Sequence, residues 1–587
     1  MSALISNSPE ASLAASARPW KELALIAAAI ALAYSNSLQG PFVLDDIGSI
    51  PENPSIRRLW PPVEVLTGAT FATVVGRPLL NLSLAVNYAL HQLRVPGYHL
   101  FNLFAHILTA WCLFGVVHRT LRLPRFAERF SPATARGLAT AVAMLWGVHP
   151  LTTSAVTYTV QRCEVMAAGW YLATLYCVIR GADAQRSDRW SVLAVVCCLL
   201  GIGTKETVVT APLIVLFYDA VFLSGSVPAA LRRRTGLYAG LFATWLPLAA
   251  LMRSSGGRSE TAGIGYGMRV LDYALSQFGY VLNYLKLSIW PHPLVFDYGD
   301  QLAHGWPEIV IPASVLLVLF AILLFIGLRK RAIAFLGFSP FLILAPTSTV
   351  VPLVTQTAAE HRMYLPLAFV VTLVVLTVWS FLFDRSTFRW PSRKTPILAV
   401  GLLIVLFGGL TWARNRDYRT EQDLWLDTVA KLPNSARARN NLGRVYLERG
   451  DGIKARQELE VAISLKPENP VAWYNLGLAC EQSRDYPAAM KSLDEAIRLR
   501  PKHALSRLHR GIVHRHLDQR DAELTDLNRA IELDSNLTEA YIKRAFAHEE
   551  RTDFEAAYRD AITAQRLGGR VQQDFMEHLE EVKRKSP

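Results

Sequence analysis

Long apolar stretches separated by short polar segments run from residue 22 to residue 413. A helix needs about 20 mostly apolar residues to cross a bilayer. By this measure we predict about eleven membrane-spanning helices, at roughly 22–39, 99–118, 138–157, 164–180, 190–204, 207–223, 237–253, 308–327, 332–350, 364–384 and 396–413. The fifth and sixth stretches are short and meet at Lys205 and Glu206, which predicts a hairpin with a charged turn. The amphipathic stretch 79–93 is expected to lie along the membrane interface.

A different pattern begins at Ala436, where small and apolar residues recur with a period of 34. The positions that keep this spacing are Gly443, Gly477 and Gly511, then Ala462, Ala496, Ala530 and Ala564, and also Leu465, Leu499, Leu533 and Leu567. Small residues let two antiparallel helices pack closely, and the stretch AWYNLG at 472–477 is typical of tetratricopeptide repeats. Four units at 436–571, closed by a capping helix at 572–587, predict a superhelix whose concave face binds a peptide or protein.

Basic residues in the apolar region predict which side of the membrane each loop faces. Arg and Lys cluster at 119–136, 180–189, 232–234, 329–331 and 385–394. With eleven spans, all five clusters fall on one side, which the positive-inside rule makes cytoplasmic. The N-terminal segment 1–21 is then cytoplasmic, and the first span fits an uncleaved signal anchor. The opposite side receives the stretch FVLDDIGSIPEN at 42–53, a connecting helix at 414–435 and the repeats.

The composition agrees with a membrane part followed by a soluble part. The 587-residue chain is 51% hydrophobic and only 19% charged, whereas soluble domains carry about 25% charged residues. Its net charge of +13 comes mostly from short clusters between apolar stretches, which does not indicate nucleic-acid binding. The six cysteines show no metal-ligand spacing and are interpreted as small apolar fillers. We therefore predict an all-α fold, with a polytopic membrane domain at 22–413 and a tetratricopeptide-repeat α-solenoid.

Several ionisable or polar side chains are predicted at the outer side of the membrane, where such groups are costly and are functional candidates. They are Asp45, Asp46, Arg77, His149, Arg162, Lys205, Glu206, Asp297, Glu360, His361, Arg362 and Tyr364. Each has a structural alternative: Arg77 could reach lipid headgroups, His149 could cap a helix, and Asp297 could anchor an interfacial helix. Asn102 and His106, one turn apart, are expected to hydrogen-bond neighbouring helices.

Carboxylates beside cations on one membrane face suit one reaction in particular. Transfer of a sugar from a lipid-linked phosphate to a hydroxyl needs a carboxylate that accepts the hydroxyl proton. It also needs cations that stabilise the departing phosphate, and arginine can bind that group in bidentate fashion. A soluble nucleotide-sugar donor would require a Rossmann-like domain, and no segment has that pattern. The donor is therefore expected to be a membrane lipid.

An ordered set of motifs resembles the transmembrane and tetratricopeptide-repeat (TMTC-like) O-mannosyltransferases, whose animal members use dolichyl-phosphate mannose. The matching stretches are FVLDDIGSIPENPSI at 42–56, RPL…S…N at 77–87, YHLFNLFAH at 98–106, HPLTTSAV at 149–156, KETVVTAPL at 205–213, LKLSIWPHPLVFDYG at 285–299, AEHRMYLP at 359–366 and RNRDYRTEQDLW at 414–425. Each motif alone is weak, but their order covers nearly the whole chain.

The resemblance implies an inverting glycosyltransferase of the GT-C type. One of Asp45 and Asp46 would be the catalytic base, with a slight preference for Asp46. Arg162, Lys205 and Arg362 would bind the donor phosphate, and Glu360 would orient them. The remaining candidates (Arg77, His149, Glu206, Asp297, His361 and Tyr364) would support the site. The sequence QRCE at 161–164 departs from the GRA-type sequence of the animal proteins, which weakens the assignment of Arg162.

These implications lead to a functional hypothesis. A sugar, mannose in the animal proteins, would move from a polyprenyl-phosphate lipid to Ser or Thr hydroxyls of secreted proteins that the repeats hold. The alanine- and arginine-rich sequence favours a bacterial inner membrane, with the repeats in the periplasm. No cofactor is assigned, and a divalent cation is left open; membrane lipids are partners and nucleic acid is not. Two alternatives are a non-enzymatic scaffold that presents the repeats for pilus or polysaccharide assembly, and a lipid-sugar flippase.

Overall fold

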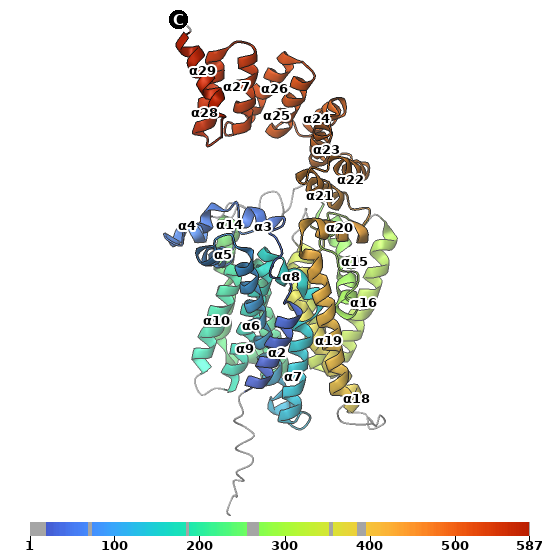
Figure 1. Ribbon diagram of the computed structural model, residues 1–587. Helices are drawn as coiled ribbons and strands as arrows, with labels where there is room; N and C mark the ends of the chain where they lie inside the picture. Colours follow the sequence, from blue (N-terminus) through green and yellow to red (C-terminus); the bar gives the residue numbers. More distant parts are fainter. Residues whose placement is uncertain are drawn as a thin grey trace, which may run out of the picture. The chain divides into compact units, whose positions relative to one another are not determined.

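The computed structural model describes residues 19–68, 73–183, 187–254, 269–303, 305–350, 356–383 and 395–585. These residues form helices and turns, with no β-strand among them (Figure 1). The chain divides into two compact units, Met1–Thr420 (unit 1) and Glu421–Pro587 (unit 2). The predicted all-α fold is thus confirmed. Most of the predicted N-terminal segment 1–21 and the basic cluster 385–394 lie outside the described residues.

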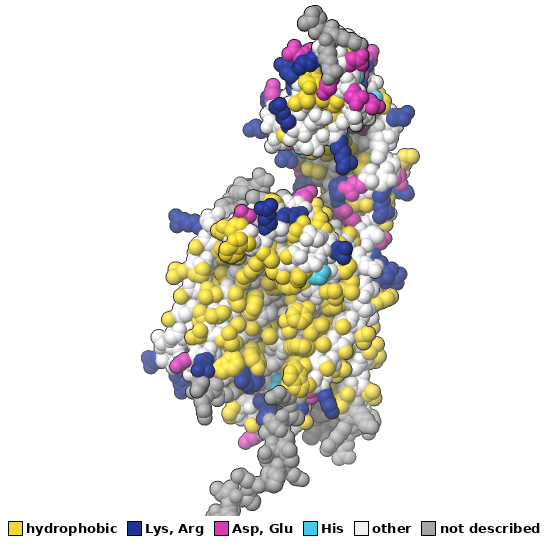
Figure 2. Space-filling view, turned by 60° about the vertical axis from the view of Figure 1, so that its left-hand side comes forward, with side chains coloured by type: hydrophobic (Ala, Val, Ile, Leu, Met, Phe, Trp, Pro, Cys, Tyr) yellow, Lys and Arg dark blue, Asp and Glu magenta, His cyan; other side chains and the backbone are white. Residues whose placement is uncertain are grey.

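Unit 1 is built from helices long enough to cross a membrane. Over the described ranges, nine helical segments meet the length and hydropathy that a span requires: Val95–Leu121, Thr159–Ala182, Ser187–Thr204, Glu206–Leu223, Thr235–Ser254, Trp306–Arg329, Arg331–Ser348, Glu360–Leu382 and Thr395–Tyr418. Figure 2 shows hydrophobic side chains covering the wall of this unit. The chain is a multi-pass membrane protein, and nine of the eleven predicted spans correspond to these segments.

The other two predicted spans contain shorter helices, α2 (Trp20–Ala33, 14 residues) and α7 (Pro132–Gly147, 16 residues). The prediction of one continuous span over 138–157 is wrong, because α7 ends at Gly147. Pro150 lacks a backbone N–H and forces the preceding His149 out of the helical region, to φ −71° and ψ 130°. Three short pieces follow: η3 (Pro150–Thr152), α8 (Thr153–Thr157) and η4 (Thr159–Gln161).

The two ends of unit 1 differ in structure and in charge. Figure 1 places α3 (Asp45–Ser49), α4 (Pro62–Thr67) and α5 (Pro78–His91) at one end, and the start of α7 at the other. The second end carries the described basic clusters, and the positive-inside rule predicts that it faces the cytoplasm; we name the two ends the outer end and the cytoplasmic end after this prediction. The helix predicted at 79–93 is confirmed as α5, which begins with Pro78 in the first position, where proline is favoured.

Unit 2 begins with α20 (Glu421–Lys431), which packs on the first helix of the repeat array. Four antiparallel pairs follow: α21 (Ala436–Glu448) with α22 (Gly452–Leu465), α23 (Pro470–Gln482) with α24 (Tyr486–Leu499), α25 (Ala504–His516) with α26 (Arg520–Leu533), and α27 (Thr538–Glu550) with α28 (Phe554–Arg566). The helix α29 (Gln573–Lys585) closes the array. The four predicted repeats are therefore present.

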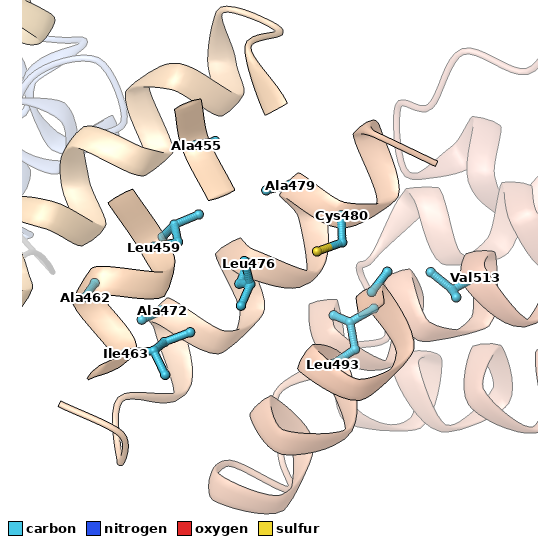
Figure 3. Packing of buried hydrophobic residues seen from close by; sticks show 11 residues of the cluster. Ala455, Leu459, Ala462, Ile463, Ala472, Leu476, Ala479, Cys480, Leu493 and Val513 are labelled. Atoms are coloured by element: carbon cyan, nitrogen blue, oxygen red, sulfur yellow. The ribbon is translucent and has the colours of Figure 1, made fainter. Parts of the chain in front are cut away.

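The 34-residue period produces a repeated packing contact. A Cβ atom on Gly477 would lie 2.7 Å from the Leu493 side chain, and one on Gly443 would lie 2.6 Å from Leu459. Glycine therefore lets the two helices of each pair approach closely. Leu459, Leu476 and Leu493 point into one core that alanines complete (Figure 3).

We expect Leu493→Ala to lower the free energy of unfolding of unit 2 by about 2–5 kcal/mol, because the substitution leaves a cavity at a fully buried position. The measurement is the denaturant concentration at which the repeats of the full-length protein become sensitive to protease. Leu505→Ala is the matched control, since Leu505 is 38% exposed and its truncation leaves no cavity. Equal effects of the two substitutions would contradict the packing described here.

Candidate functional site

The two adjacent aspartates of the outer loop occupy different environments. Leu44, just before them, has a positive φ of 45°, and this sharp turn begins the short helix α3. Asp46 is fully buried and its carboxylate accepts hydrogen bonds from the backbone N–H of Val43 (3.1 Å) and of Val160 (2.7 Å). Asp45 is exposed, and its backbone N–H donates to the Tyr158 hydroxyl at 3.0 Å. The pair is thus divided into one buried and one exposed carboxyl.

This difference bears on the slight preference for Asp46 as the base, which stays a prediction. Burial raises the pKa of Asp46 to about 8; the two backbone N–H groups act to lower it, and the charge of Asp45 raises it further. With no exposed surface and both oxygens bonded to the backbone, Asp46 is placed to tie the outer loop to η4. Of the two carboxyls, only that of Asp45 is exposed.

The segment 160–164, at the start of α9 (Arg162–Asp183), connects this loop to the charged groups. Its first residue donates a hydrogen bond to Asp46, as described above. Cys163 Sγ lies 3.7 Å from Nη1 of Arg77, which donates to it, and Glu164 forms an ion pair with Lys205. Through Val160, Cys163 and Glu164, this segment contacts the acidic loop, the N-cap of α5 and the turn that precedes η5 (Glu206–Thr210).

Two ion pairs lie side by side around this segment. Arg77 binds Glu206 through two hydrogen bonds, Nε to Oε2 at 3.2 Å and Nη2 to Oε1 at 3.0 Å. The pair of Lys205 with Glu164 is nearly buried, since Lys205 is only 6% exposed. Buried charges require close partners, because desolvation otherwise makes them costly. The predicted hairpin turn at Lys205 and Glu206 is therefore part of an ionic network.

The third cation of the site, Arg362, lies in η8 (Glu360–Met363), far from the other two in the sequence. Arg362 donates hydrogen bonds to the carbonyls of Thr357 (3.0 Å) and Gln356 (2.6 Å), and it lines a small cavity together with Glu164. Its neighbour His361 is buried, and Lys205, Arg362 and Arg77 all interact electrostatically with it. We call Arg77, Glu164, Lys205, Glu206 and Arg362 the outer ionic cluster.

Arg162 does not have the position predicted for a phosphate ligand. Its side chain is completely buried, and its guanidinium donates to Asn87 Oδ1, to the Ser83 carbonyl and to the Tyr98 carbonyl. The guanidinium also lies over the Phe101 ring, 4.5 Å from its centroid. The structure thus shows Arg162 joining α5, α6 (Val95–Leu121) and α9 from within the protein.

Glu360 and Asp297 organise a loop between two spans. Glu360 accepts hydrogen bonds from the Val295 backbone N–H and from the Tyr298 hydroxyl, the latter at 3.4 Å. Asp297 accepts from the backbone N–H of Gly299 at 2.8 Å, which forms a turn. Both carboxylates are buried, and their contacts fix the conformation of this loop; the orienting role of Glu360 toward the cations stays a prediction.

His149 and Tyr364 have packing contacts. His149 accepts a hydrogen bond from the Leu151 backbone N–H, which is the helix-capping alternative considered from the sequence. The Tyr364 hydroxyl bonds to His106, and its ring packs edge-on against Trp146 at 4.9 Å. These contacts give both residues a structural role.

Sequence reasoning missed two members of the site. Glu164 was visible as a charge at the start of a span, but nothing in the sequence showed that it pairs with a lysine 41 positions away. Cys163 was interpreted as an apolar filler, whereas it contacts both Arg77 and Gln161. No group of three His, Cys, Asp or Glu side chains that could hold a metal ion occurs in the part of the chain that the structure describes.

The buried Asp46 predicts a pH-dependent stability. An unfolded aspartate titrates near pH 4, whereas in the folded protein its pKa is about 8. Folding therefore favours the protonated form, so this stabilisation is complete below about pH 4 and is lost as the pH rises through 8. Between pH 5 and 8 we expect the Tm of the wild type to fall more steeply than that of Asp46→Asn, which cannot ionise. Glu52→Gln, which removes an exposed carboxylate from the same loop, is the control and should keep the wild-type slope; equal slopes for all three proteins would refute the assignment.

Comparison with known proteins identifies relatives of both units. Residues 413–470 and 470–503 match family models described as tetratricopeptide repeat. Human protein O-mannosyl-transferase TMTC3 is 24% identical over 502 residues, which cover 78% of this chain and 52% of the relative. Human protein O-mannosyl-transferase TMTC1 is 25% identical over 526 residues, covering 77% and 56%. The Tmtc3 protein of Drosophila melanogaster is 30% identical over 237 residues, covering 36% and 25%.

Solved structures resemble a part of the chain. MamA is 21% identical, covers 28% of this chain and 90% of its own, and has a TM-score of 0.23. YrrB, described as a TPR protein with an unusual peptide-binding site, is 17% identical, covers 32% and 98%, and has a TM-score of 0.25. The similarity to the O-mannosyl-transferases confirms the resemblance predicted from the ordered motifs. The chain spans about half the length of the curated relatives it matches.

Proposed function

We propose that this chain, like the relatives named protein O-mannosyl-transferases, transfers a sugar from a polyprenyl-phosphate lipid to Ser or Thr hydroxyls of secreted proteins. The observation that carries the proposal is the outer ionic cluster, joined through residues 160–164 to a loop with an exposed carboxylate. The cluster supplies positive charge at the outer end of a membrane unit, where a lipid-bound phosphate can reach it. Mannose is the sugar that the relatives' names suggest.

The exposed carboxylate would perform the acid–base chemistry. Asp45 accepts the proton of the acceptor hydroxyl as its oxygen attacks the anomeric carbon of the sugar. The new carbon–oxygen bond forms while the bond from that carbon to the phosphate oxygen breaks, and the electron pair leaves with the polyprenyl phosphate. A single displacement of this kind inverts the anomeric configuration. Asp46 holds the loop in place through Val160.

The cations would stabilise the charge that the departing phosphate gains. Arg362 is the best placed, because its hydrogen-bond partners are neutral carbonyls and it lines the cavity beside Glu164. Lys205 offers further donors beside its bond to Glu164. Arg77, held at both ends of its guanidinium by Glu206 and by backbone and thiol groups, contributes to the field. Preorganised charge of this kind is often the largest single contribution to catalysis.

The cavity beside Arg362 suits a lipid-linked donor. Its remaining walls include Ala167, Val208, Ile343 and Leu365, so charge and apolar surface meet there. Its volume is about 20 Å³, enough for roughly one water molecule. Donor binding would therefore require α17 (Arg331–Ala345) and α18 (Tyr364–Phe383) to separate from α9.

The repeats of unit 2 would hold the acceptor. Tetratricopeptide superhelices use their concave face for extended protein ligands. We further propose a bacterial inner membrane with the repeats on the periplasmic side, since the described basic clusters lie at the other end of unit 1.

We expect Asp45→Asn to lower sugar transfer by about 10²–10⁴-fold, the usual effect of removing a general base. The assay uses the full-length protein in vesicles with polyprenyl-phosphate mannose and a Ser/Thr-rich acceptor protein. Glu128→Gln is the matched control, because it removes an exposed carboxylate from a loop at the cytoplasmic end. Unchanged transfer by Asp45→Asn would refute the role of Asp45. Donor movement across the vesicle without transfer would favour a flippase, and neither activity would favour a scaffold.

Variants of two cations should distinguish a loss of sugar transfer from a loss of folding stability. Arg362→Gln removes a charge whose bonds are to carbonyls, so we expect the Tm to be nearly unchanged while transfer falls at least tenfold. Lys205→Met leaves Glu164 buried without its cation, which costs about 3–5 kcal/mol of stability. Thermal unfolding and transfer rates are measured on the same preparations. Loss of stability in Arg362→Gln as large as that in Lys205→Met would contradict the assignment.

A further inference from the structure

A second, larger cavity lies at the cytoplasmic end of unit 1. Its volume is about 740 Å³, within the 300–1,000 Å³ range typical of ligand pockets. Residues of α6, α9, α17 and α18 line it, together with α11 (Ala211–Tyr218) and η6 (Asp219–Leu223). It shares no lining residue with the small cavity beside Arg362. The proposed transfer reaction therefore has no use for it.

The walls of this cavity are hydrocarbon and aromatic. Leu113, Leu172, Phe335, Phe369 and Leu373 lie around it. The rings of Phe222 and Phe335 pack edge-on at 5.3 Å, and that of Phe369 follows at 5.8 Å from Phe335. A chain of methylene groups would gain about 0.8 kcal/mol for each one buried on such a surface.

Cations gather around the rim of the cavity. They come from the loop after α6 and from the turn between α16 (Trp306–Arg329) and α17: Arg125, Arg129, Arg329, Lys330 and Arg331. All five are exposed. Figure 2 shows basic side chains at this lower end of unit 1.

The described contacts of Arg125 and Arg331 in the rim are with neutral groups. Arg125 donates to the Val221 carbonyl and lies 5.1 Å from the Phe126 ring centroid, while Arg331 donates to the Gly225 carbonyl at 2.8 Å. Among the described residues, no carboxylate forms an ion pair with Arg125, Arg329, Lys330 or Arg331. Glu128, in the same loop, does not line the cavity. In contrast with the outer ionic cluster, the positive charge here is available to a ligand.

We propose that this cavity binds an anionic phospholipid of the cytoplasmic leaflet. Its acyl chain occupies the apolar cavity, and its phosphate lies between the loop that carries Arg125 and the turn that carries Arg329 and Arg331. Basic pockets between spanning helices on the cytoplasmic side suit such headgroups, and the guanidinium fork suits phosphate. The lipid would join two loops that are about 200 positions apart in the sequence.

The test measures lipid binding to the full-length protein in neutral detergent by native mass spectrometry, with phosphatidylglycerol and phosphatidylcholine of identical chains. We expect the wild type to bind phosphatidylglycerol at least tenfold more tightly than phosphatidylcholine. The double substitution Arg329→Gln and Arg331→Gln should remove that preference. Arg232→Gln with Arg233→Gln is the matched control: it removes two exposed basic charges that do not line the cavity, and it should keep the preference.

A third variant and a competing anion distinguish binding of the lipid's acyl chain from binding of its headgroup. Ala368→Trp fills the cavity from α18 and should weaken binding of both lipids; its Tm shows whether the variant is folded. The Arg329 and Arg331 variant, altered only at exposed positions, keeps the test valid if Ala368→Trp is unstable. Inorganic phosphate in excess should leave the lipid bound. Displacement by phosphate alone would assign the rim to a free anion and overturn the proposal, as would equal phosphatidylglycerol binding by the wild type and the arginine variant.

Discussion

Charge buried at the outer end of the membrane unit has to be neutralised within the protein, and the turn at residues 160–164 is where this takes place. Its Val160 N–H satisfies the buried Asp46, and its Glu164 pairs with Lys205. Removing either partner of the Glu164–Lys205 pair would leave a desolvated charge, which is far more costly than the pair itself. The positions of these segments therefore depend on one another: the acidic loop, the N-cap of α5 and the turn before η5.

The end of α7 makes this arrangement possible. Because Pro150 stops the helix, the chain enters α9 through short turns whose backbone N–H groups point away from any helix ladder. One of these groups is the donor to Asp46.

The cations at the two ends of unit 1 have different kinds of partners. At the outer end, Arg77 and Lys205 are paired with carboxylates, and Arg162 is enclosed by carbonyl oxygens and rings. At the cytoplasmic end, the rim of the large cavity is exposed and bonds to neutral groups. Ion pairs with carboxylates fix the geometry of the outer end, whereas Arg125, Arg329, Lys330 and Arg331 form no ion pair with a carboxylate among the described residues. In unit 2, Arg510 and Arg544 lie 34 positions apart and bind Asp526 and Asp560 through the same pair of hydrogen bonds.

The sequence by itself determined the repeats, most of the spans and the relationship to the O-mannosyl-transferases, and it marked the stretch that forms α5. These features depend on hydropathy and period, which are local and can be counted along the chain. It also brought most of the site residues into one candidate set. Only the tertiary structure decided that Asp45 is exposed and Asp46 buried, that Arg162 is enclosed, and that Glu164 belongs to Lys205. The physical reason is that burial and ion pairing depend on neighbours 41 to 129 positions away, and no local pattern records which of them folding brings together.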